Sequence, residues 1–130
     1  MKHYTVVAAI IKHEDKFLCM QRNSSKHAYL SYKYEFPGGK VEPGESNEAA
    51  LVREIKEELD LDISLEKQFL TVEHEYPDFK LTMHSFLCNS NTPEFNLKEH
   101  VAFQWLNKTE LKSLDWAAAD VPIVDKLMNA

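Results

Sequence analysis

The sequence predicts an α+β fold, an α/β/α sandwich in which a mixed β-sheet carries helices on its faces. Three observations lead to this prediction. The chain has 130 residues, which suits a single domain over 1–130. Strand-like apolar runs lie on both sides of one amphipathic helical segment, and the C-terminus is helical in pattern. Because strands and helices do not alternate, a doubly wound nucleotide-binding fold is excluded.

Apolar and β-branched runs separated by polar turns predict six strands. The first run, TVVAAII at 5–11, is continuous, which is typical of a strand buried on both faces. Turns at 13–16 and 77–78 would join neighbouring runs as hairpins. The polar segment 23–33 is expected to be a loop. The six strands are expected at residues 5–11, 17–22, 34–36, 70–76, 80–88 and 100–106.

The third of these strands runs into an unusual turn. Pro37 should end it, and Gly38-Gly39 permits a backbone path that is closed to other residues. A second loop, 40–45, then leads to the central helix.

The central helix is predicted from about residue 47 to residue 59. Ser46 is a suitable N-cap, and Glu48 suits the positive end of the helix dipole. The apolar residues of this segment form one stripe that should face the sheet. The stripe consists of Leu51, Val52, Ile55 and Leu59.

Two shorter helices are expected near the C-terminus. Thr109 would cap the first, which ends at Leu114. Pro122 fits the first turn of the second, over 121–129. These helices would complete the layers around the sheet.

Composition excludes several classes of function. The net charge of −6 argues against stable binding to nucleic acid, which needs clustered Lys and Arg. No apolar run approaches the roughly 18 residues of a membrane span. Cys19 and Cys88 lie far apart and, with no export signal visible, indicate reduced thiols in a cytoplasmic protein. Nothing in the sequence specifies an oligomeric state.

The central helix also carries an acidic cluster. Glu54, Glu57 and Glu58 follow i, i+3, i+4 spacing, which brings their Cβ atoms within about 5–6 Å of one another. Like charges so placed repel, and oxygen ligands grouped on a rigid helix suit Mg²⁺ or Mn²⁺. Such ions would let an acidic protein bind phosphates. On the helix alone, the competing interpretation is an ordinary solvated acidic face.

The residues around this cluster favour the metal interpretation. The segment Gly39-Lys-Val-Glu-Pro-Gly-Glu45 precedes the helix, and Arg53-Glu54-Ile-Lys-Glu57-Glu58 closes it. This pattern resembles the Nudix box, the signature of the MutT-type nucleotide hydrolases. The resemblance extends over nearly the whole chain and implies the Nudix-type fold. One position departs: Asp60 stands where the family usually has Gly. An Asp tolerates the left-handed conformation of a helix C-cap at modest cost, so we expect a slightly strained or shifted helix end and intact chemistry.

The resemblance implies divalent-metal-dependent hydrolysis of a nucleoside triphosphate to a nucleoside monophosphate and pyrophosphate. Two hypotheses about the substrate remain open. One is CTP and modified cytosine nucleotides, slightly favoured by the C-terminal segment, and the other is 8-oxo-dGTP. Either would give a role in cleaning or adjusting the nucleotide pool. The alternatives are a non-catalytic nucleotide-sensing domain, which would not need the intact glutamates, and an acidic interaction module.

The resemblance also implies roles for the glutamates. Glu57 and Glu58 would bind metal, and Glu54 would be a further ligand or the group that accepts the proton of the attacking water. The carbonyl of Gly39 is the expected backbone ligand. Glu99, just before the last strand, matches a further metal-binding glutamate or is a surface acid at a strand end.

The remaining candidates surround the metal site. Arg53 would orient carboxylates through a bidentate pair. Glu45 would fix the loop or the Arg53 head group, with a contact to the metal as the alternative. Lys40 and Arg22 are candidate phosphate contacts, with ordinary surface charge as the alternative. None of the six histidines has metal-ligand spacing, and only His84 is a weak pocket candidate.

Recognition of the base is expected from residues outside the box. Phe36 offers a ring face for stacking, with a core position at a strand end as the alternative. Asp120 stands where related proteins place a polar residue that reads the base edge, because a carboxylate accepts hydrogen bonds from an exocyclic amine. The competing interpretation of Asp120 is an N-cap for the last helix.

Overall fold

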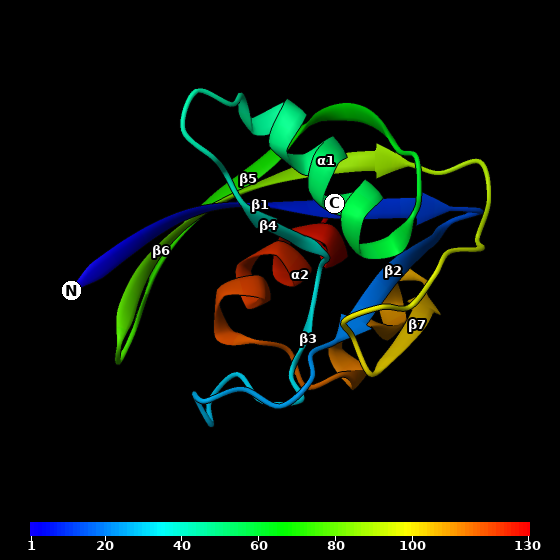
Figure 1. The fold of residues 1–130 in the computed structure, drawn as a ribbon. Coiled ribbons are helices and arrows are strands. Elements are labelled where there is room, and N and C mark those ends of the chain that lie inside the picture. Colours follow the sequence, from blue (N-terminus) through cyan, green and yellow to red (C-terminus); the bar gives the residue numbers. More distant parts are fainter.

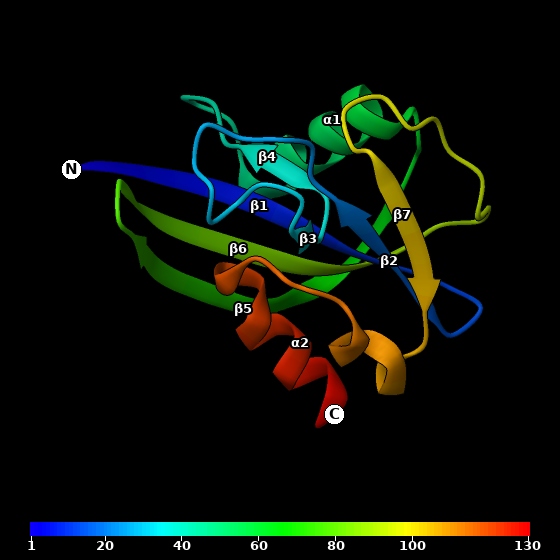
Figure 2. The same ribbon diagram turned by 90° about the horizontal axis from the view of Figure 1, so that it is seen from below.

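A computed structural model describes residues 1–130 and confirms the predicted α+β fold, a mixed seven-stranded sheet between helices (Figure 1). Figure 2 shows α1 on one face of the sheet and α2 on the other. The strands are β1 (Lys2–His13), β2 (Lys16–Gln21), β3 (Tyr34–Glu35), β4 (Gly38–Lys40), β5 (Ser64–Tyr76), β6 (Phe79–Asn89) and β7 (Ala102–Leu106). The helices are α1 (Asn47–Leu59) and α2 (Val121–Met128), with 3₁₀ turns η1 (Lys108–Ser113) and η2 (Ala118–Asp120). No helix is both long and apolar enough to span a membrane.

Strand β1 lies at the centre of the sheet and pairs with β2, β4 and β6. The path of strands is β3-β2-β1-β6-β5, with β4 added to β1 and β7 added to β2. β1 and β6 are parallel from the Lys2–Phe79 pair to the Lys12–Asn89 pair. β1 and β2 form the expected hairpin, whose two turn residues, Glu14 and Asp15, both have positive φ. β5 and β6 form the second expected hairpin, although β5 begins six residues before the predicted strand.

The continuous apolar run of β1 is buried on both faces, as its sequence predicts. Val7, Ala9 and Ile11 belong to the cluster beneath α1. Ala8 and Ile10 belong to the larger cluster on the opposite face, which includes residues of α2. Because successive side chains of a strand point to opposite faces, one apolar segment supplies both cores.

Helix α1 has the predicted bounds, but its buried face differs from the predicted stripe. Val52 is 42% exposed, whereas Ala50 is fully buried with Leu51, Ile55 and Leu59. The buried face therefore extends toward the acidic side of the helix, where Glu54 and Glu58 are partly buried. The reason is β4, which lies beside that side of α1 (Figure 1).

The double glycine is a strand and not only a turn. Gly38 and Gly39 belong to β4, which pairs antiparallel with β1 opposite Ala8 and Val7. A Cβ on Gly38 would overlap the carbonyl group of Val7. The sequence pattern identified the need for glycine here but attributed it to a turn, because a three-residue strand has no periodicity to detect.

The predicted cap of the first C-terminal helix is wrong. Asn107, not Thr109, caps η1, and its side chain accepts from the Thr109 N–H at 3.1 Å. The Asn107 N–H in turn donates to the side chain of Glu110, which completes a capping box. η1 is also a 3₁₀ helix, and it ends at Ser113, one residue before the predicted end.

Asp60 adopts the left-handed conformation expected at the end of α1. Its φ is 52° and ψ 40°, and its N–H donates to the Lys56 carbonyl at 3.0 Å. The helix end is therefore strained at a non-glycine residue but not displaced from its predicted position.

We predict that Asp60→Gly raises the free energy of unfolding by about 0.5–1 kcal/mol, because glycine removes the cost of positive φ. Asp62→Gly is the matched control: Asp60 and Asp62 both pair with Lys56, at 3.5 and 3.3 Å, but Asp62 has no positive φ. Urea denaturation should show stabilisation by the first substitution and none by the second. A loss of stability in Asp60→Gly would contradict the strain argument.

Candidate active site

The guanidinium of Arg53 connects the acidic residues of α1 with the loop that precedes the helix. It forms a bidentate pair with Glu45, from Nε at 2.7 Å and from Nη2 at 2.9 Å. Nη1 donates to Glu54 at 2.8 Å and to Glu57 at 3.3 Å. Nη2 also donates to the carbonyl of Lys40 at 3.1 Å. One side chain therefore fixes three carboxylates and the end of β4.

This network has the electrostatic effect expected of charge-assisted hydrogen bonds. The bonds from Arg53, with a second contribution from the Glu42 N–H, lower the pKa of Glu45 to about 2. The same bonds from Glu45 and Glu54 raise the pKa of Arg53 above its ordinary value. Glu45 therefore remains ionised across the working pH range and holds the Arg53 head group, as its position before the N-cap predicts.

Gly39 brings the backbone of β4 against the carboxylate of Glu54. A Cβ at this position would overlap the carboxylate carbon and both oxygens. The absence of a side chain at residue 39 therefore permits the approach of Glu54 to the strand. The backbone of β4 and the Glu54 carboxylate thus lie side by side, and carbonyl and carboxylate oxygens are the ligands that hard cations prefer.

Glu58 is the acidic residue with the most unusual environment. Burial raises its pKa to about 8, and Glu99, Glu35, Glu54 and Glu57 add electrostatic repulsion in that order. Its Oε2 is buried and has no hydrogen-bond partner in the protein. A buried, unsatisfied carboxylate oxygen surrounded by other carboxylates fits the binding of a divalent cation, which would remove both penalties.

The carboxylates of α1 lie near one another but do not surround a common point. No group of three or more acidic, histidine or cysteine side chains converges on one point. Arg53 accounts for part of this arrangement, because it engages Glu54 and Glu57 itself, and the Glu57 side chain remains 60% exposed. Glu54, Glu57 and Glu58 lie in the C-terminal half of α1, with Gly39 of β4 against Glu54, and their role as ligands stays a prediction.

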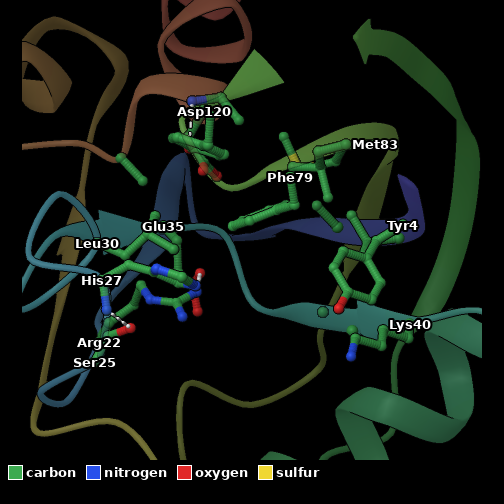
Figure 3. Close-up of a pocket in the computed structure, with 18 of the residues that line it drawn as sticks. Tyr4, Arg22, Ser25, His27, Leu30, Glu35, Lys40, Phe79, Met83 and Asp120 are labelled. Carbon is green, nitrogen blue, oxygen red and sulfur yellow. Dashed lines mark hydrogen bonds and ion pairs between the residues drawn. The ribbon is translucent and has the colours of Figure 1, made fainter. Parts of the chain in front are cut away.

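A cavity of about 860 Å³ opens beside these residues. Gly39, Glu58 and Glu99 line its acidic end, and Phe36, Met83 and Asp120 line a less polar part. Figure 3 shows Arg22 and Glu35 on one side, Tyr4 and Lys40 on the other, and Asp120 at the far end. The predicted phosphate contacts and base contacts therefore share one space with Glu58 and Glu99, whereas Glu54 and Glu57 do not line it.

Glu35 and His100 belong to this site but were not singled out in the sequence. Arg22 donates to Glu35 Oε1 at 2.9 Å, and His100 Nε2 donates to Glu35 Oε2 at 2.8 Å. The side chain of His100 is only 6% exposed. Three buried polar side-chain atoms of the molecule have no hydrogen-bond partner: Arg22 Nε, His100 Nδ1 and Glu58 Oε2. The position of His100 directly after Glu99 was the only sequence signal for its place in the site, and a lone histidine is usually a packing residue.

Asp120 bonds to the chain before the glycines instead of capping the last helix. Its Oδ1 accepts from the Phe36 N–H at 3.0 Å, and it makes no side-chain bond to the first turn of α2. Burial, followed by repulsion from Glu35, raises the pKa of Asp120 well above its usual range. The capping interpretation is therefore wrong, and this carboxyl group lines the cavity.

Phe36 and Lys40 have partners within the protein. The Phe36 ring is buried and stacks on Trp116 with centroids 4.8 Å apart, although the residue also lines the cavity. The ammonium of Lys40 lies 4.3 Å from the centre of the Tyr4 ring. His84, the weak pocket candidate, bonds to Thr71 at 2.9 Å and does not line this cavity.

Comparison with known proteins gives a consistent result. A family described as "NUDIX domain" matches residues 6–126. The chain is 32% identical to the 8-oxo-dGTP diphosphatase of Escherichia coli K12 over 127 residues, 98% of each chain. It is 35% identical to the CTP pyrophosphohydrolase of the same organism, over 98% of this chain and 93% of the relative.

A solved structure supports the same assignment. The MutT protein of methicillin-resistant Staphylococcus aureus 252, described as a Nudix hydrolase, is 42% identical, with a TM-score of 0.79. The match covers 99% of this chain and 98% of that protein. The segment that resembles a Nudix box thus lies within a fold that the two proteins share over nearly their whole length. This chain belongs to the Nudix hydrolase family, among relatives of the MutT type.

Proposed function

We propose that this Nudix hydrolase cleaves nucleoside triphosphates to nucleoside monophosphate and pyrophosphate, with Mg²⁺ or Mn²⁺ as cofactor. The observation that carries the proposal is the single cavity that joins Glu58 and Glu99 to Asp120. A polyphosphate at the acidic end and a base at the Asp120 end would occupy one continuous space. The protein would act on the nucleotide pool of the cytoplasm.

The metal would be held by Glu54, Glu57 and Glu58, with the Gly39 carbonyl and Glu99 as further ligands. When bound, a divalent ion neutralises phosphate charge, orients the attacking water and stabilises the leaving oxygen. Glu54 is the candidate to accept the proton of that water. Arg53 and Glu45 hold the carboxylates in place and do not need to touch the substrate.

Lys40 and Arg22 are the candidate phosphate contacts among the cavity residues. Arg22 is already paired with Glu35, whereas the Lys40 ammonium rests only on an aromatic ring. Lys40 lines the same cavity as Glu58, so its ammonium is placed to contact phosphates bound there. We therefore assign the stronger phosphate contact to Lys40.

Base recognition is proposed for the Asp120 end of the cavity. Asp120 uses Oδ1 on the Phe36 N–H, which leaves Oδ2 for the substrate. A carboxyl group favours partners with an exocyclic amine, as in cytosine. Cytosine nucleotides are therefore proposed first, in line with the relative named CTP pyrophosphohydrolase, and 8-oxo-dGTP second, in line with the relatives named 8-oxo-dGTP diphosphatase.

A panel of ordinary, oxidised and methylated nucleoside triphosphates tests the proposal directly. With Mg²⁺ we expect release of pyrophosphate, not orthophosphate, and the highest kcat/KM for a cytosine nucleotide or 8-oxo-dGTP. Excess EDTA should abolish turnover, and added Mg²⁺ or Mn²⁺ should restore it, because the carboxylates alone repel a polyphosphate. Turnover that persists in excess chelator would remove the metal from the mechanism.

Glu57→Gln should lower kcat by at least about 100-fold, because the amide keeps the shape of the side chain but removes a ligand charge. Glu57 is largely exposed, so its free energy of unfolding should change by less than about 0.5 kcal/mol. Glu48→Gln, in the first turn of the same helix and without the bond to Arg53 that Glu57 makes, is the matched control and should retain activity. Equal kcat values for the two variants would refute the ligand assignment.

Glu58→Gln should inactivate the enzyme but stabilise the metal-free protein. The folded chain raises the Glu58 pKa to about 8, so folding is penalised once this carboxyl ionises. The sign follows from linkage: between about pH 4.3, the unfolded value, and pH 8, the folded state binds more protons and wild-type stability falls as pH rises.

The gain in unfolding free energy of Glu58→Gln over wild type should therefore grow from pH 5 to pH 8.5 in EDTA. Urea denaturation at both pH values measures it. Glu57→Gln provides the comparison and should show no such growth. A gain that is the same at both pH values would mean that Glu58 is not strained in the folded chain.

A further inference from the structure

The side chain of Lys40 ends on the ring of Tyr4. The ammonium nitrogen lies 4.3 Å from the ring centre. Figure 3 shows these two side chains together at one side of the cavity, across from Arg22 and Glu35. A cation over an aromatic face is attracted by the negative charge of that face, an effect worth about two- to five-fold in an equilibrium constant at an exposed site.

The register of the sheet explains why these two residues meet. Lys40 on β4 pairs with Val6 on β1, and the strands are antiparallel. Residues directly opposite share a face, and the side chain two positions along β1 on that face is Tyr4. The diagonal separation of such neighbours, about 7–8 Å, is within reach of an aromatic ring and a lysine.

Further contacts hold the ring of Tyr4 and the backbone of Lys40 in place. The Tyr4 ring contacts the edge of Phe79, with centroids 5.5 Å apart and planes at 72°. The carbonyl of Lys40 accepts from Arg53 at 3.1 Å, and the next N–H, of Val41, donates to Thr5 at 3.1 Å. Only the flexible Lys40 side chain remains free, and the ring restricts it.

The charge on Lys40 is therefore oriented without being neutralised. The other predicted phosphate contact, Arg22, is neutralised by Glu35 at 2.9 Å. An aromatic face attracts a cation but leaves its full charge, so Lys40 can still bind a phosphate. Fixing a lysine before the ligand arrives also reduces the rotamer entropy that binding would cost.

We infer that Tyr4 is a positioning residue, which holds the ammonium of Lys40 toward the phosphates of the substrate. This inference rests on the proposed function in one respect, the phosphate contact of Lys40. It assigns no contact of Tyr4 with the base, which distinguishes it from a stacking role.

A double-mutant cycle tests the inference with Tyr4→Leu, Lys40→Met and the combined variant. The probe is inorganic tripolyphosphate with Mg²⁺, titrated by calorimetry, because it has no base or sugar. Tyr4→Leu should raise the Kd about two- to five-fold when Lys40 is present and by less than about 1.5-fold in the Lys40→Met background. Tyr4→Phe keeps the ring and should recover most of the lost affinity.

Lys26→Met is the matched control, since Lys26 lines the same cavity without resting on the Tyr4 ring. Tyr4→Leu should weaken tripolyphosphate binding equally in wild-type and Lys26→Met backgrounds. Thermal melting confirms that each variant is folded, and an unfolded Tyr4→Leu is replaced in the cycle by Tyr4→Met.

Three results would overturn the inference. These are additive effects of the Tyr4 and Lys40 substitutions, an unchanged tripolyphosphate Kd in Tyr4→Leu, or equal losses in Tyr4→Phe and Tyr4→Leu. With nucleotides, a Tyr4→Leu effect that depends on the base but not on Lys40 would indicate stacking instead. Because the probe is not a nucleotide, coupling measured with it stands even if the enzyme hydrolyses no nucleoside triphosphate, and in that case only the proposed function fails.

Discussion

The site depends on the placement of one guanidinium among several carboxylates. Arg53 engages Glu45 with two bonds, Glu54 and Glu57 with one each, and the backbone of Lys40 with another. Its planar arrangement of donors is what a lysine could not supply. Without it, the acidic side chains would repel one another and the loop before α1 would lose its attachment to the helix. The geometry of the proposed metal site is therefore set by a residue that would not need to touch metal or substrate.

The same helix shows how function opposes stability. An ordinary amphipathic helix would bury Val52 and expose its glutamates, whereas α1 exposes Val52 and partly buries Glu54 and Glu58. Burial without a partner raises the pKa of Glu58, so its charged form is unfavourable in the folded chain, and the proposed cation would relieve this penalty. The four fully buried apolar residues of α1 offset this cost, since they anchor the helix to the sheet.

The sequence predicted most of the fold and the placement of the acidic residues on α1 because the signals there are local. Ser46 caps α1 and the spacing of Glu54, Glu57 and Glu58 follows helical geometry, so no distant contact was needed. The failures involve contacts between distant residues. Asp120 bonds to Phe36 across 84 positions, and His100 bonds to Glu35 across 65. Neither pairing has a spacing rule, and the exposure of Val52 depends on where β4 lies.

The cavity draws its walls from almost the whole length of the chain, from Tyr4 on β1 to Asp120 beside α2. Its scaffold includes the parallel pairing of β1 with β6, whose partners are separated by most of the sequence. Contacts between such distant segments close large loops and form slowly. On the ribosome, the acidic helix can form early, but the lining of this cavity is complete only once Asp120 has left the exit tunnel.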